Sequence, residues 1–165
     1  MDIPDLLGIA LGKIKYDNTL ILDIETTGFG SESRITCISV KLLDSNPVSF
    51  CLDSEERLIK EFFQYLLALE GTILLVTYGG VRFDYKVIRK RTSQYSLFME
   101  LNWFNKLHKS DLAQTTNGGL EGKTGDGKLA IKLWKEKRID ELIEYCENDV
   151  LLTEKLYLKS KEGVL

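Results

Sequence analysis

Residues 20–28, which read Leu-Ile-Leu-Asp-Ile-Glu-Thr-Thr-Gly, constrain the fold of this chain more than any other stretch. As a β-strand, this stretch places aliphatic side chains on one face and both Asp23 and Glu25 on the other, because alternate side chains point to opposite faces. The two carboxylates are then ~6.5 Å apart along the strand and repel each other in a half-buried sheet. A divalent cation such as Mg²⁺ or Mn²⁺ would relieve that repulsion, since hard cations bind carboxylate oxygens. The alternative is an edge strand whose acids face water, and the motif alone leaves both interpretations open.

Length and composition predict a single domain over residues 1–165. The chain is 44% hydrophobic and 28% charged, which is typical of a globular protein with a proper core. Its formal net charge of −3 does not indicate a nucleic-acid-binding protein. However, an enzyme that uses metal ions can hold phosphate without a strongly basic surface. Basic residues cluster locally, and each cluster fits either a solvated helix face or a binding patch: Lys86/Arg89/Lys90/Arg91, Lys106/Lys109 and Lys132/Lys135/Lys137/Arg138.

The three cysteines argue against a disulfide framework. Cys37, Cys51 and Cys146 are odd in number, widely spread and without a C-x-x-C spacing, which favours a reducing compartment. The sequence has neither a signal-peptide pattern at its N-terminus nor an apolar run of membrane-spanning length. We therefore expect a cytoplasmic protein with no membrane partner.

Periodicity and turn residues predict an α/β fold. We expect residues 1–18 to be a lead-in segment with a short helix near 3–11, and the glycine-rich residues 115–127 to be a flexible loop that either closes over a substrate or only connects elements. The first three strands are expected to be antiparallel, and the almost wholly apolar run 72–78 is expected to lie parallel to strand 19–25. The predicted strands are 19–25, 35–43, 47–52, 72–78 and 108–113, and the predicted helices are 55–70, 81–91, 95–107, 127–136 and 138–160.

Asp84 is a further acid in a suggestive position. It follows the Gly79-Gly80 break after strand 72–78 and stands near the start of a predicted helix. An acid there is favoured by the helix dipole alone. Alternatively, the glycine break delivers Asp84 to the carboxyl edge of the sheet, where Asp23 and Glu25 are expected to lie.

Asp149 is predicted to be a buried acid. On helix 138–160 it falls in the middle of an apolar stripe formed by Leu142, Tyr145, Cys146, Leu152 and Leu156. An unpaired charge in such a position costs several kcal/mol, at order of magnitude, so Asp149 requires an arginine, a hydrogen-bond network or a metal ion. The other acids of this helix are expected to face solvent: Asp140, Glu144, Glu147 and Glu154.

Taken in order, these motifs resemble those of the DEDD superfamily of 3′–5′ exonucleases. The resemblance covers residues 19–157 and consists of D-x-E at Asp23 and Glu25, F-D at Phe83 and Asp84, and Y-x-x-x-D at Tyr145 and Asp149. The tyrosine is similar to that of the DEDDy branch, which includes proofreading domains of DNA polymerases. The histidine branch has a histidine where this chain has Glu144. Many relatives also carry an asparagine four or five residues before the second-motif aspartate, where this chain has Gly80 and Gly79.

The resemblance implies a ribonuclease-H-like fold with a mixed five-stranded sheet flanked by helices, and a site for two divalent ions, Mg²⁺ or Mn²⁺. In that arrangement Asp23 bridges both ions, Glu25 and Asp149 complete the first site, and Asp84 holds the second. The ordinary pKa of a tyrosine is about 10, so Tyr145 is expected to orient the attacking water and not to act as an unassisted base. Asp111 belongs to a short D-L segment that recurs in relatives, and we do not place it among the metal ligands.

The implied activity is removal of nucleoside 5′-monophosphates from the 3′ end of single-stranded nucleic acid, with DNA favoured and RNA also possible. Thr26, Thr27 and Gly28 follow the first strand directly and are expected to meet the terminal nucleotide. Phe83 is a candidate for contact with a base, but the alternative, a role in the core, is favoured. The competing hypothesis from another class is a non-catalytic nucleic-acid-binding or docking domain that retains this fold.

Overall fold

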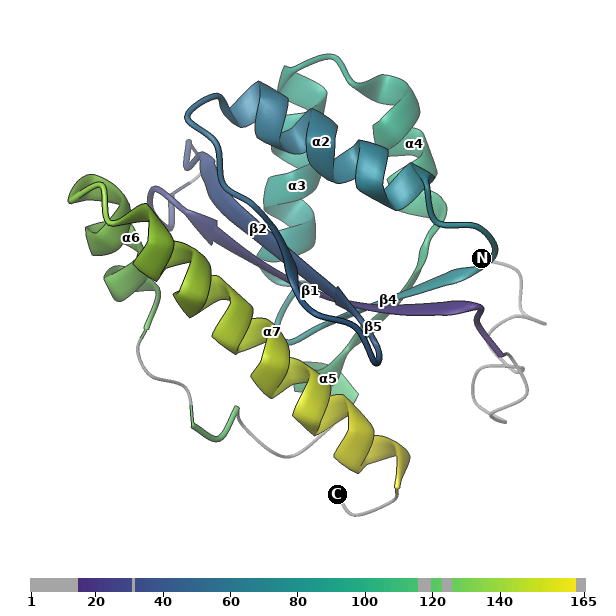
Figure 1. The fold of residues 1–165 in the computed structure, drawn as a ribbon. Helices are drawn as coiled ribbons and strands as arrows, with labels where there is room; N and C mark the ends of the chain where they lie inside the picture. Colours follow the sequence, from purple (N-terminus) through teal and green to yellow (C-terminus); the bar gives the residue numbers. More distant parts are fainter. Residues whose placement is uncertain (1–14, 31, 116–119, 123–125, 163–165) are drawn as a thin grey trace.

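The computed structural model describes residues 15–30, 32–115, 120–122 and 126–162 (Figure 1). Its centre is a five-stranded sheet in the order β3-β2-β1-β4-β5. Strand β1 (Asn18–Thr26) pairs antiparallel with β2 (Ile35–Leu42), which pairs antiparallel with β3 (Val48–Phe50). On its other side β1 pairs in parallel with β4 (Ile73–Thr77), and β4 pairs in parallel with β5 (His108–Asp111). The predicted mixed sheet with three antiparallel strands is confirmed.

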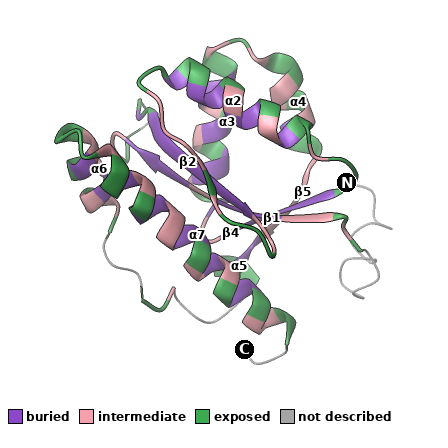
Figure 2. Ribbon diagram, viewed as in Figure 1, coloured by how far each residue is buried: buried purple, intermediate pink, exposed green. Residues whose placement is uncertain are grey.

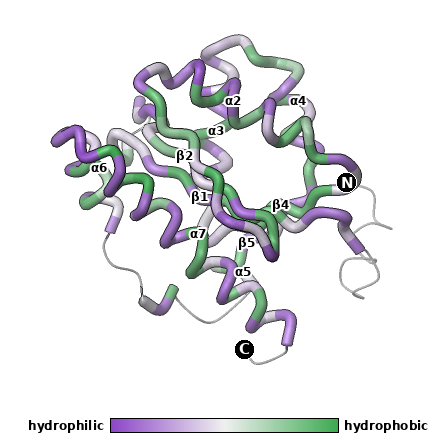
Figure 3. The backbone as a smooth tube through the Cα atoms, viewed as in Figure 1, coloured by the Kyte–Doolittle hydropathy of each residue, from purple (hydrophilic) through white to green (hydrophobic). Residues whose placement is uncertain are grey.

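Helices cover both faces of the sheet (Figure 1). One face carries α2 (Glu55–Leu67), α3 (Asp84–Gln94) and α4 (Phe98–Lys106), whose apolar side chains form the larger core cluster with the sheet. The other face carries α5 (Leu112–Thr115), α6 (Gly127–Lys135) and α7 (Ile139–Lys161), over two smaller clusters. Both layers of helices bury their inner faces against the strands and leave their outer faces exposed (Figure 2). Hydrophilic and hydrophobic segments accordingly alternate along α7 (Figure 3).

Local sequence explains the starts of α2 and α6, whose caps Ser54 and Asp126 accept from backbone N–H groups. The Oγ of Ser54 accepts a hydrogen bond from the backbone N–H of Arg57, so Ser54 caps α2 as its position predicts. Helix α2 ends at Leu67, before the predicted end at residue 70. Helix α3 begins at Asp84 and not at residue 81, because the carbonyl of Gly79 accepts from the N–H groups of Arg82 and Phe83 in a turn. The predicted helix near 3–11 and most of the predicted loop 115–127 lie outside the described residues, and the short helix α5 was not predicted.

A buried ionic network joins α2 to α3 and β2. Glu55 is 2% exposed, and its carboxylate accepts hydrogen bonds from the Arg91 guanidinium, the Tyr95 hydroxyl and the backbone N–H of Ile35. Burial by itself would raise the pKa of Glu55, but these hydrogen bonds outweigh it, so the pKa lies below its ordinary value. The network fixes the helices of one layer to the start of β2.

A row of polar contacts lies between α7 and the antiparallel strands. Lys41 of β2 is buried and forms an ion pair with Glu154 of α7. The Ser49 hydroxyl of β3 donates to Glu147 at 2.7 Å. The prediction that Glu147 and Glu154 face solvent is therefore wrong, because the sheet face beneath α7 carries polar partners for them. Among the described residues, no helix is both long and apolar enough to cross a membrane.

Candidate active site

The two acids of β1 lie where that strand ends. Asp23 and Glu25 share one face of β1, and Glu25 is 7% exposed while Asp23 is half-buried. A bulge between Glu25 and Thr26 shifts the pairing with β2 directly after the second acid. Two carboxylates are therefore held side by side at the carboxyl end of the central strand, where the sheet pairing becomes irregular.

Helix α7 lies against this pair. The Sγ of Cys146 is 3.5 Å from Asp23 Oδ2 and 3.7 Å from the Asp23 backbone oxygen. Tyr145 and Asp149 flank Cys146 on the same helix, and they are 5% and 1% exposed. Three residues advance a helix by only ~4.5 Å, so Asp149 lies about one turn from the residue that touches Asp23. The predicted burial of Asp149 is confirmed, and the helix segment that carries it packs at the acids of β1.

Asp84 is the first residue of α3 and is 6% exposed. Strand β4, which leads to it, is the parallel neighbour of β1, so Asp84 follows the same edge of the sheet at which Asp23 and Glu25 lie. The turn between β4 and α3 is held by a residue of β5. Asp111 Oδ1 accepts from the N–H of Gly79 at 2.6 Å, and Oδ2 accepts from that of Val81 at 3.0 Å. Asp111 is thus a structural acid, a role that the sequence did not reveal.

The same turn restricts one of the two positions where relatives carry the asparagine of the second motif. A Cβ added to Gly80 would lie 2.3 Å from the Thr77 hydroxyl oxygen, so this position has no room for a side chain. At Gly79 an added Cβ would meet nothing within 4 Å, but the backbone φ is +79°. A left-handed conformation favours glycine and is tolerated by asparagine.

The residues after β1 use their hydroxyl groups locally. Thr26 Oγ1 donates to the Gly28 carbonyl at 2.6 Å, and Thr27 Oγ1 accepts from the Arg34 N–H at 3.0 Å. Both contacts shape the loop between β1 and β2. Contact of Thr26, Thr27 or Gly28 with a nucleotide stays a prediction.

A cationic hollow of about 200 Å³ lies between this loop and α3. Its lining includes Phe29, Arg82, Phe83, Lys86 and Lys90. Phe83 also packs against the larger core cluster, so it belongs both to the core and to this hollow. Phe29 is 64% exposed and lies with three cationic residues in this lining, of which Lys90 is ion-paired with Glu32 at 2.8 Å.

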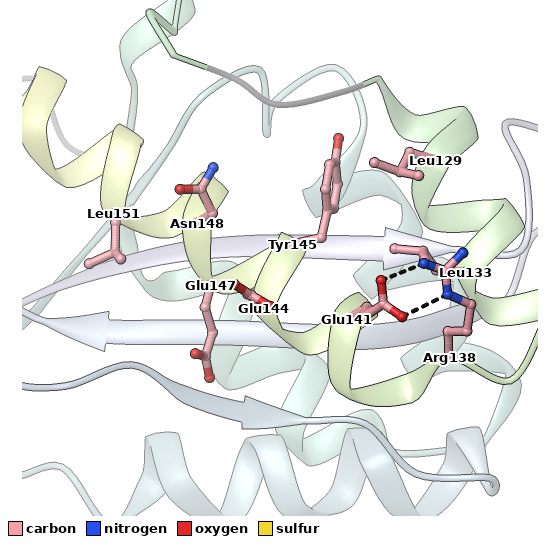
Figure 4. A pocket seen from close by; sticks show the side chains of 9 residues that line it. All are labelled: Leu129, Leu133, Arg138, Glu141, Glu144, Tyr145, Glu147, Asn148 and Leu151. Atoms are coloured by element: carbon pink, nitrogen blue, oxygen red, sulfur yellow. Dashed lines mark hydrogen bonds and ion pairs between the residues drawn. The ribbon is translucent and has the colours of Figure 1, made fainter.

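A second hollow, of about 420 Å³, lies between α6 and α7 (Figure 4). Tyr145 rises from α7 beside Leu129 in this view, and Arg138 is bonded to Glu141. Three glutamates, Glu141, Glu144 and Glu147, line this hollow. Arg138 and Tyr145, the latter one of the predicted site residues, line this hollow as well.

The cysteines were not part of the predicted site, yet two of them lie at it. Cys37 lies opposite Glu25 in the pairing of β1 with β2, and the neighbouring thiols of Cys146 and Cys51, together with burial, raise its pKa. Burial raises the pKa of Cys146 to about 12, so this thiol keeps its proton at neutral pH. One oxygen of Asp23, one of Glu25 and the Cys146 Sγ lie within 4.8 Å of one another, a spacing that suits ligands of one metal ion. The sequence signal was the position of Cys146 beside Tyr145 in the apolar stripe.

Comparison with known proteins places this fold in a family. The family model described as the RNase_H superfamily matches residues 20–160. The chain belongs to the RNase H superfamily. The ribonuclease-H-like fold inferred from the sequence motifs is thereby confirmed. A search of curated protein sequences finds no match.

Solved structures of this RNase H superfamily fold include exonucleases. The family B DNA polymerase of the hyperthermophilic archaeon Pyrobaculum calidifontis aligns with a TM-score of 0.63 and 15% identity over 87% of this chain and 24% of the polymerase. E. coli exonuclease I in complex with a dT13 oligonucleotide aligns with a TM-score of 0.56 and 13% identity over 88% of this chain and 42% of that enzyme. The chain therefore spans less than half the length of either neighbour, and the likeness concerns the fold.

Proposed function

We propose that this protein is a metal-dependent 3′–5′ exonuclease that acts on single-stranded nucleic acid, with DNA as the favoured substrate. One observation carries the proposal: the α7 segment bearing Tyr145 and Asp149 packs on β1 at Asp23, where Glu25 also lies. Asp84 follows the same edge of the sheet through β4. Asp23 and Glu25 share one group of donor atoms that, among the described residues, does not include Asp84 or Asp149, while α7 and β4 bring the latter two toward the same end of the central strand.

The donor set fits divalent cations. Glu25, Asp84 and Asp149 are carboxylates with at most 7% exposure, and their charges are costly to bury unless cations or hydrogen bonds compensate them. Two divalent ions bound there would stabilise the attacking and leaving oxygens of the reaction and would lower the pKa of a bound water. Asp23, Glu25 and Asp149 would hold one ion, and Asp23 with Asp84 the other.

The remaining groups have roles in binding and orientation. Tyr145 would hold the attacking water through its hydroxyl group. The hollow lined by Arg82, Lys86 and Lys90 supports binding of the phosphate backbone, because cationic side chains bind phosphates and an exposed aromatic ring such as Phe29 can stack on a base. The structure of E. coli exonuclease I with an oligonucleotide supports testing single-stranded DNA first.

Matched DNA and RNA oligomers, labelled at either end and incubated with Mn²⁺ or Mg²⁺, test the proposal. We expect stepwise shortening from the 3′ end with release of mononucleotides. Asp149→Asn is expected to lower the rate by at least ~10³-fold, since the ligand set of a metal site would be broken. Asp140→Asn removes an exposed acid from the same helix and is expected to leave the rate unchanged.

The same assay separates the competing function. Binding of oligomers without any cleavage, in both metals, would refute the exonuclease and favour a nucleic-acid-binding domain. Cleavage that starts from the 5′ end would refute the proposed direction. Faster turnover of RNA than of DNA would assign RNA as the substrate and refute the DNA preference.

A further inference from the structure

The Cys146 sulfur lies within ligand distance of the carboxylates that are proposed to hold cations. Its Sγ is 3.5 Å from Asp23 Oδ2 and lies in one group of donor atoms with Asp23 and Glu25. Cys146 is wholly buried on α7, whereas Asp23 is half-buried. A cation can therefore reach this group past Asp23, with the sulfur as the innermost donor.

One pair of these donors, Cys146 Sγ and Asp23 Oδ2, has the spacing of two ligands of a tetrahedral ion, and the whole group lies within 4.8 Å. Zinc binds sulfur at ~2.3 Å and carboxylate oxygen at ~2.1 Å, which puts the ligand atoms of a tetrahedral site ~3.4–3.6 Å apart. The observed distance from Cys146 Sγ to Asp23 Oδ2 is 3.5 Å. Hard ions such as Mg²⁺ bind oxygen ligands and do not bind a neutral thiol, whereas softer ions bind thiolate preferentially. Cys146 therefore adds a donor that distinguishes between these two classes of ion.

We propose that Cys146, Asp23 and Glu25 form a site for a thiophilic divalent cation such as Zn²⁺ or Cd²⁺, in competition with Mg²⁺ or Mn²⁺. This inference rests on the proposed role of Asp23 and Glu25 as cation ligands but not on turnover. When the ion binds, the S–H bond of Cys146 breaks, the proton leaves to solvent and the sulfur bonds to the cation, with no change of oxidation state. An ion held in this way occupies the ligands that hydrolysis requires, so thiophilic ions inhibit the proposed reaction.

The other two cysteines provide the controls. Cys51 is half-buried and interacts with Cys37, and among the described residues neither belongs to the donor group of Asp23. A site formed by thiols alone would depend on Cys37 and Cys51. The proposed site depends on Cys146 and on the carboxylates.

Titration of the metal-free protein with Cd²⁺, in the absence of nucleic acid, tests the proposal through the ultraviolet thiolate-to-cadmium charge-transfer band. We expect the band in the wild-type protein and in Cys51→Ala. In Cys146→Ala we expect the band to disappear and the affinity for Cd²⁺ to fall by at least ~10-fold, which is the smallest loss typical of a metal-site partner. Asp23→Asn is expected to weaken the band as well. Calorimetry with Mn²⁺ should show that Cys146→Ala still binds this harder ion. If Cys146→Ala loses Mn²⁺ binding too, Cys146→Ser, which is closer in size, is judged by the same criteria.

The absence of the band in the wild-type protein would overturn the proposal. So would a band that persists in Cys146→Ala or disappears in Cys51→Ala, since the cation would then lie among the other thiols. The titration contains no substrate, so its result is independent of nuclease activity. A Cys146-dependent band in a protein without nuclease activity would refute the proposed function and support this site. An active enzyme without the band would support the proposed function and refute this site.

Discussion

Replacing Asp111 with Asn should lower both the stability of the protein and its proposed activity. Asp111 is 5% exposed, and its carboxylate accepts from the backbone N–H groups of Gly79, Val81 and Ala113 at 2.6, 3.0 and 3.2 Å. Asparagine keeps one acceptor oxygen but turns an NH₂ group toward a backbone donor. At least one hydrogen bond to a charged group is lost, each worth about 1.5–3 kcal/mol, and a part-buried N–H of the turn loses its acceptor. We expect the free energy of unfolding to fall by about 2–4 kcal/mol.

Urea and thermal unfolding followed by circular dichroism measure this effect. For a chain of this length, the loss corresponds to a melting temperature lower by roughly 4–16 °C. Because the turn from Gly79 leads to Asp84, turnover with Mn²⁺ is also expected to fall by about 10- to 100-fold, which is the effect of displacing a ligand by ~1 Å.

Asp126→Asn is the matched control for Asp111→Asn. Asp126 is exposed and accepts from the Lys128 N–H as the cap of α6, and asparagine caps helices about as well as aspartate. It should therefore change stability by less than ~0.5 kcal/mol. An Asp111→Asn variant as stable as this control would show that Asp111 does not hold the turn.

Two further changes test the fold around the site. Glu55→Gln should destabilise the protein by about 3–5 kcal/mol, because Arg91 is left as a buried charge without its partner. The lowered pKa of Glu55 means that the unfolded chain binds a proton at this carboxylate more readily than the folded protein does. The wild-type protein should therefore lose stability as the pH falls from about 6 through 4.5 and below. Glu55→Gln should lose less stability over this range, and urea titrations at each pH measure the difference. In the second-motif turn, Gly79→Asn should change the melting temperature little, whereas Gly80→Asn should lower it, at a cost of about 1–3 kcal/mol, because its Cβ overlaps Thr77. Equal melting temperatures of these two variants would contradict the observed difference in space.

The sequence predicted features that depend on local periodicity. The alternation around Asp23 identified β1, the apolar run before Gly79 identified a strand buried on both faces, and the helical stripe predicted the burial of Asp149. Each of these follows from side-chain spacing within a single element. The same reasoning placed the start of α3 too early, because the turn after β4 depends on hydrogen bonds to Asp111, a residue of another strand.

The errors on α7 have the same origin. An acid on a helix is expected to face water unless its partner is known, and the partners of Glu147 and Glu154 are supplied by β3 and β2. The contact of Cys146 with Asp23 is likewise between elements far apart in the chain. Sequence periodicity gives the buried face of a helix, but it does not give the residues of the sheet that this face meets.

These polar contacts also set how far along the sheet α7 lies. Apolar packing alone tolerates small sliding of a helix, whereas hydrogen bonds and ion pairs are lost within an ångström or two. Cys146 meets β1, Glu147 meets β3 and Glu154 meets β2, so a shift of α7 by one turn would break all three contacts at once. Because Asp149 lies between these anchors, its position relative to Asp23 is determined by residues on both sides of it. The geometry of the proposed metal site therefore depends on an ion pair, Lys41 with Glu154, that lies more than a full helical turn beyond Asp149.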